Sequence, residues 1–107
     1  MTRAQNLADL IDQQAQWRAG RAVKHPTDER HRSSALALAG LATFVRTLSD
    51  DDPAIVDMSK VGAFTGDMFY PGERAAELIS RYGFDSPTAP VRTLIDALAA
   101  ACTAEAP

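Results

Sequence analysis

Residues 35–42 read Ala35-Leu36-Ala37-Leu38-Ala39-Gly40-Leu41-Ala42, and this run decides the fold class. It continues into Phe44, Val45 and Leu48, so apolar residues occupy nearly every side of a helix drawn through it. A helix of this kind is buried on nearly all sides, by other helices or by a second copy of the chain. We therefore expect residues 28–49 to form the central helix of an all-α protein or one half of a dimer interface.

The chain before this run predicts another long helix. Apolar residues, mostly alanine, recur at helical spacing from Arg3 to Val23, and the small side chains favour close packing against a neighbour. His25 precedes a proline and should end this helix, because the residue before proline avoids the α region. Thr27 is then expected to cap the helix that contains residues 35–42.

Three further helices are expected after this run. The first is short, from Pro53 to Val61, with Asp52 as its cap. The second extends from Pro71 to Tyr82, and Gly83 should end it in the left-handed conformation, with the next residue folding back on the helix. The third begins after a cap at Thr88 and has the clearest apolar stripe of the chain, formed by Val91, Leu94, Ile95, Leu98, Ala101 and Cys102.

Together these patterns predict an all-α protein that forms a single small domain over residues 1–107. Four long helices and one short helix would pack as a bundle or as an orthogonal helical array. Residues 62–72 have no helical pattern and are expected to be irregular or to form a small hairpin.

Composition narrows the expected compartment and chemistry. Cys102 is the one cysteine, so the chain forms no disulfide within itself, and the two histidines do not complete a zinc site with it. The N-terminus lacks the apolar core of a signal peptide, and the longest apolar run is about half the length of a membrane-spanning helix. We expect a cytoplasmic protein that uses no metal or cofactor. The chain contains twenty alanines and nine arginines, and such a bias toward these two residues is common in proteins of GC-rich bacteria.

A basic segment lies between the first two helices. Residues 18–32 contain five basic and two acidic side chains, a net charge of +3 in a chain whose total is −3. Such asymmetry can mark a site for phosphate or nucleic acid. The alternative is a solvated helix end in which the arginines pair with nearby carboxylates. The candidate anion or nucleic-acid contacts are Arg18, Arg21, Lys24, Arg30 and Arg32.

Residues 62–72 hold three of the seven aromatic residues and three of the six glycines. A flexible backbone with aromatic and methionine side chains suits a binding loop or a lid over a pocket. The alternative is a plug that closes one end of the helical array. We expect Phe64 to be the plug and Tyr70 to be exposed. The candidate partner contacts are Phe64, Met68, Phe69 and Tyr70.

Patterns for catalysis are weak. Cys102 lies in an apolar stripe, which keeps a thiol inert. His25 and His31 are six residues apart, whereas two metal ligands on one helix face need a spacing of four. The three aspartates at 50–52 are explained by helix termination and capping. These observations predict no catalytic residue, and they make an enzyme the less favoured class.

The interpretation favoured by these observations is a non-catalytic helical module that binds another protein or a second copy of itself. The first alternative is a nucleic-acid-associated regulator that uses the basic segment. The second is a small-ligand or enzyme pocket between helices, closed by residues 62–72.

Overall fold

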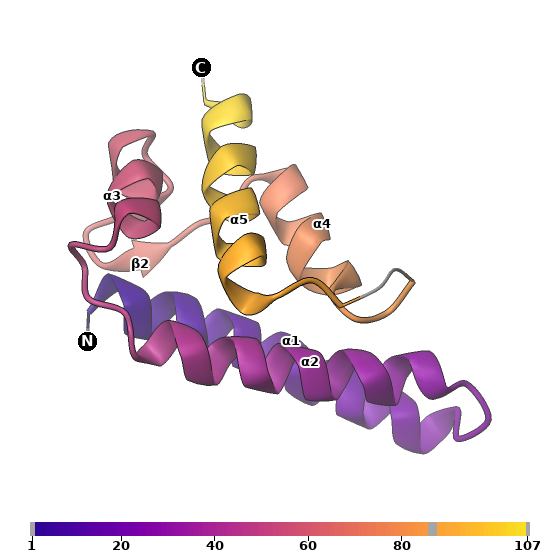
Figure 1. Ribbon diagram of the computed structural model, residues 1–107. Helices are drawn as coiled ribbons and strands as arrows, with labels where there is room; N and C mark the ends of the chain where they lie inside the picture. Colours follow the sequence, from indigo (N-terminus) through magenta and orange to yellow (C-terminus); the bar gives the residue numbers. More distant parts are fainter. Residues whose placement is uncertain (1, 86–87, 107) are drawn as a thin grey trace.

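A computed structural model of the chain describes residues 2–85 and 88–106. Two long helices, α1 (Arg3–Lys24) and α2 (Glu29–Arg46), form an antiparallel hairpin that sets the length of the molecule (Figure 1). The molecule measures 42 × 26 × 21 Å along its principal axes. The prediction of an all-α fold is confirmed, with five helices and one two-stranded sheet in the described residues.

The remaining elements form a second layer on one side of this hairpin (Figure 1). They are α3 (Pro53–Lys60), β1 (Phe64–Thr65), β2 (Met68–Phe69), α4 (Glu73–Arg81) and α5 (Val91–Glu105). Helix α5 packs against both α3 and α4, and it also meets α2, while β2 meets α1. The turn end of the α1–α2 hairpin extends beyond this second layer (Figure 1).

Local capping explains most helix boundaries. Thr2 and Gln5 form a reciprocal capping box at the start of α1, which satisfies backbone N–H groups that the helix leaves free. Helix α2 is capped by Asp28, which corrects the expected cap at Thr27, and it ends at Arg46, short of residue 49. Asp52 caps α3 as predicted, with Pro53 in its first turn.

The second half of the chain confirms one boundary prediction and corrects two. Helix α4 has nine residues, so it is shorter than the long helix expected from Pro71 to Tyr82. Gly83 has a φ of +69°, the left-handed conformation expected after α4. A Cβ at this position would lie 2.7 Å from the Cβ of Ala37 on α2, so close packing also requires glycine here. The expected cap at Thr88 is wrong, because Pro90 precedes the first residue of α5 and provides no side-chain cap.

The core lies between the two layers. Its fully buried large side chains come from every helix: Leu7 and Ile11, Leu38 and Leu41, Ile55 and Met58, Ile79, and Ile95 and Leu98. The expectation that the second helix is buried on nearly all sides is wrong within one chain, because Leu36 is 67% exposed. The physical reason is the two-layer arrangement, in which α2 has α1 beside it and α5 across from it, so its outward face meets solvent.

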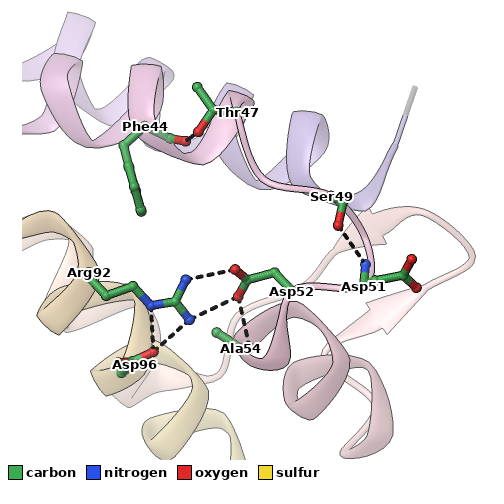
Figure 2. Close-up of polar contacts among 8 residues, drawn as sticks. All are labelled: Phe44, Thr47, Ser49, Asp51, Asp52, Ala54, Arg92 and Asp96. Carbon is green, nitrogen blue, oxygen red and sulfur yellow. Dashed lines mark hydrogen bonds and ion pairs between the residues drawn. The ribbon is translucent and has the colours of Figure 1, made fainter.

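A polar network joins α3 to α5 (Figure 2). The Asp52 carboxylate accepts a hydrogen bond from the backbone N–H of Ala54, and it accepts two from Arg92, at 2.7 and 2.9 Å. Arg92 also donates to Asp96, one turn along α5. The hydrogen bonds from Arg92 hold the pKa of Asp52 below its usual range. This network fixes the start of α3 against α5.

Candidate functional site

The aromatic residues of the 62–72 segment are divided between the core and the surface. In the two-stranded sheet, Phe64 pairs with Phe69, and both are buried, with ring centroids 5.1 Å apart. Met68 and Tyr70 lie on the opposite face, and they are 53% and 60% exposed. Phe64 is therefore the plug and Tyr70 the exposed residue, as the sequence predicted. Phe64 and Phe69 are not accessible to a partner in this structure, so only Met68 and Tyr70 remain candidate contacts.

Polar contacts hold this β-hairpin against the start of α1. Arg3 donates from Nε to the carbonyl of Gly66 at 3.1 Å, and Asn6 donates from Nδ2 to the carbonyl of Asp67 at 2.8 Å. The turn places Gly66 at a φ of +60°, which favours glycine. Residues 62–72 are thus docked on α1, and they lie outside the lining of the two grooves described next.

An apolar groove of about 890 Å³ lies between α4 and α5. Along α5, Ala97, Ala100 and Ala104 recur on the outward side, where their short side chains leave space beside α4. Leu78 and Leu94 add larger apolar surface to the lining. A smaller groove of about 460 Å³ lies on the other side of α5, against α3, and shares Ala100 and Ala104. The outward side of α5 is therefore a ridge of small residues between two hollows.

Charged side chains from α4 and the following turn border the larger groove. Arg81 lies 3.7 Å from the Glu77 carboxylate and 3.4 Å from that of Asp85. Arg74 adds a second positive charge, so the border presents both signs. Sequence reasoning missed this groove. The alanines at 97, 100, 101 and 104 were its signal, but the pattern alone did not show that two neighbouring helices would leave the outward ones uncovered.

Three buried polar side chains, Arg18, His31 and Ser34, form what we call the buried polar cluster. Arg18 is only 6% exposed and donates to His31 Nδ1 at 3.1 Å and to the carbonyl of Ser80 at 2.6 Å. Ser34 donates to the carbonyl of Tyr82 at 2.7 Å. The cluster therefore caps the C-terminal end of α4 from both helices of the α1–α2 hairpin.

The protonation state of His31 follows from this geometry. Because a guanidinium group only donates, His31 must accept at Nδ1 and is neutral. Burial lowers the pKa of His31, and the positive charge of Arg18 lowers it further. Burial likewise lowers the pKa of Arg18. Side chains with shifted pKa values are common at functional sites, and they also occur in structural networks of charged groups.

The rest of the basic segment has three kinds of environment. Arg30 makes two hydrogen bonds with the carboxylate of Asp28, at 2.9 and 2.8 Å, and these bonds hold the pKa of Asp28 well below its usual range. Arg21 is half-buried, with its guanidinium carbon 5.9 Å from the ring centroid of Trp17. Lys24 and Arg32 are exposed. The segment therefore does not present five free cations to a nucleic acid.

Metal-binding clusters and membrane-spanning helices are both absent from residues 2–85 and 88–106. No group of three or more His, Cys, Asp or Glu side chains in these ranges has the arrangement of a metal site. Within the same ranges, no helix is both long enough and apolar enough to span a membrane. Cys102 is buried, and this burial raises its pKa, which disfavours the reactive thiolate.

Comparison of the chain with protein-family models, with curated proteins and with solved structures gave no match.

Proposed function

We propose that this chain is a protein-binding module and that its α4–α5 groove receives an apolar helix of a partner protein. The observation that carries the proposal is the groove of about 890 Å³, whose α5 side is built from alanines at helical spacing. Helix-in-groove recognition places the apolar face of an amphipathic helix in a hollow of this kind. Exposed apolar surface that a chain leaves uncovered often marks an interaction site.

The shape of the groove supports a helix as its occupant. Ala97, Ala100 and Ala104 recur at spacings of three and four residues, so they form a straight strip along α5. Small residues at a helix contact let two helices approach closely, while larger apolar side chains of the partner would fill the space beside Leu78 and Leu94. The mixed charges along α4 suit a partner helix whose apolar stripe is flanked by both acidic and basic residues.

The test compares one substitution in the groove with a matched substitution outside it. Ala100→Arg places a long charged side chain in the groove, and Ala76→Arg places the same side chain at an exposed position of α4 outside the groove lining. Proteins captured from the native host by the wild-type chain are quantified by mass spectrometry. A synthetic peptide that covers the amphipathic helix of the most enriched captured protein is then titrated against each variant by calorimetry. We expect Ala100→Arg to weaken peptide binding by about tenfold or more, and Ala76→Arg to change it by less than about twofold.

Three outcomes would contradict the proposal. These are equal binding by wild type and Ala100→Arg, equal loss in the two variants, and no captured protein that Ala100→Arg loses selectively. A second copy of the chain is the competing occupant. Sedimentation equilibrium would reveal a dimer through the groove as one that Ala100→Arg dissociates and Ala76→Arg does not.

A further inference from the structure

Two arginines on α1 bring unneutralised positive charge together near the turn end of the hairpin. Arg18 and Arg21 are one helical turn apart, and their guanidinium carbons lie 4.9 and 5.9 Å from the ring centroid of Trp17. Nearby carboxylates are already engaged, Asp28 by Arg30 and Asp85 by Arg81. Over the part of the chain that the structure describes, neither Arg18 nor Arg21 forms an ion pair. The two like charges repel each other, and at Arg18 this repulsion is opposed by the more distant carboxylates of Asp85 and Asp28, which form no ion pair with it.

Each of these arginines also has a buried N–H group that lacks an acceptor. The Nε atoms of Arg18 and Arg21 are shielded from solvent, and no acceptor among the described residues bonds to either. Across the described ranges, these two Nε atoms are the only buried side-chain nitrogen or oxygen atoms without a hydrogen-bond partner. Folded proteins rarely leave buried donors unsatisfied, and a charged donor is the most costly to leave so. One bound anion would supply acceptors to both donors, which lie on adjacent turns of one helix.

We propose that Arg18 and Arg21 form a binding site for an oxyanion of the phosphate type, with the Trp17 indole as its movable cover. Guanidinium groups match the geometry of phosphate oxygens, and a phosphate has enough oxygens and charge to serve both arginines at once. Arg18 is already held in place by His31, by the Ser80 carbonyl and by the Phe84 ring, whose centroid lies 3.9 Å from its guanidinium carbon. The site is therefore largely preorganised.

Trp17 supplies both access and a means of detection. Its side chain is 52% exposed, so it has room to rotate away from the two guanidinium groups. An exposed indole next to a phosphate site also offers a stacking surface to a base that carries the phosphate. This site lies at the hairpin end rather than in the α4–α5 groove, so it stands or fails independently of the proposed protein-binding function.

The experiment follows the fluorescence of Trp17, the one tryptophan, as inorganic phosphate replaces chloride at constant ionic strength. We expect a saturable change in the wild-type chain and affinity weaker by about tenfold or more in Arg21→Leu. Arg32→Leu is the matched control, because it removes the same charge from an exposed position on α2. It should keep the wild-type affinity within about twofold, since solvent and salt screen an exposed charge.

Calorimetry of the same titrations detects binding that leaves the fluorescence of Trp17 unchanged. Circular dichroism checks that each variant is folded. Should Arg21→Leu not fold, Arg21→Lys takes its place, because it keeps the charge and loses the guanidinium group. Weaker binding by Arg21→Lys supports the site, and wild-type affinity contradicts it. The absence of saturable binding in both measurements, or an equal loss in Arg21→Leu and Arg32→Leu, would also overturn the proposal.

A second arm of the experiment distinguishes the sources of the phosphate. Adenosine monophosphate is titrated beside inorganic phosphate under the same conditions. Affinity about tenfold or more higher for the nucleotide indicates a phosphate ester whose base stacks on Trp17. Equal affinity indicates free phosphate. Both results support the oxyanion site.

Discussion

Arg18, His31 and Ser34 show how single polar residues join the two layers of this molecule. The last carbonyls of a helix have no partners within the helix, and the end of α4 lies over the α1–α2 hairpin. Arg18 and Ser34 donate to two of these carbonyls, and the positive charge of Arg18 also meets the negative end of the helix dipole. His31 completes the arrangement by accepting from Arg18.

We predict that this cluster makes stability depend on pH through His31. Its pKa is lowered in the folded chain, mainly by burial and then by Arg18, with smaller effects from Arg21 and His25 and an opposing effect from Asp28. As pH falls through the ordinary value of 6.5, the unfolded chain therefore takes up a proton before the folded chain does. The contribution of His31 to the free energy of unfolding is therefore fully present above that pH. It decreases as the pH falls below 6.5, until His31 of the folded chain also becomes protonated.

The measurement is urea unfolding of wild type and His31→Gln between about pH 5 and 7. Glutamine keeps an acceptor for Arg18 but does not titrate, so the difference between the two pH profiles isolates His31 from the other titrating groups. We expect the wild-type free energy of unfolding to decrease more steeply toward acid pH. Identical slopes would mean that His31 does not hold a lowered pKa.

Among the elements, α3 depends most clearly on a contact that is distant in sequence. With eight residues, it is too short to be stable by itself in water. Asp52 both caps its first turn and accepts two hydrogen bonds from Arg92 on α5 (Figure 2). The capping role is local and readable from the chain, whereas the ion pair requires that α5 lie beside α3.

Two substitutions at Asp52 should separate these roles. Asp52→Ala removes the cap and the ion pair, and we expect it to lower the free energy of unfolding by about 1–2 kcal/mol. Asparagine is also a good cap, so Asp52→Asn should cost less, about 1 kcal/mol or below, because the Arg92 side chain is 41% exposed and solvent partly screens its ion pair. Urea unfolding at neutral pH measures both. An Asp52→Asn variant as unstable as Asp52→Ala would assign the stability to the charge rather than to the cap.

At the scale of the whole molecule, the two-layer arrangement decides which apolar surfaces stay uncovered. One is the α4–α5 groove, and the other is the outward strip of α2, where Leu36, Ala39 and Gly40 are exposed. The strip is smaller than the sequence suggested, because Leu38, Leu41 and Val45 are buried within one chain. Its small residues at 39 and 40 would nevertheless let a second helix approach closely.

We predict a homodimer that forms through this outward strip of α2. Closed two-fold symmetry is the commonest way in which chains bury surplus apolar surface. Leu36→Glu places a charge at the centre of the strip and should convert the dimer to monomer, while Val23→Glu, at an exposed position near the end of α1, should leave it unchanged. Sedimentation equilibrium at micromolar concentration decides the outcome. A wild-type chain that shows only the 11.5 kDa species would rule out the dimer.

The features that the sequence determined by itself depend on residues close together along the chain. Helical periodicity predicted four of the five helices in the described residues, Asp52 and Pro53 marked the start of the fifth, α3, and Gly83 marked the end of α4. The burial of Phe64 and the exposure of Tyr70 were also predicted correctly. Capping, proline geometry and left-handed glycine act over a few residues, so their effects can be read without the fold.

The tertiary structure alone decided which helix faces are covered and which charges are buried. Arg18 belongs to a basic segment in the sequence, but its acceptor is the carbonyl of Ser80, 62 residues away, and only the packing of α4 on the hairpin brings them together. The groove beside Ala97 and Ala100 likewise depends on the separation of α4 and α5. Local preferences set the axis and ends of each helix, whereas burial of apolar surface between distant elements sets how the helices pack, and no periodicity within one helix encodes its neighbours.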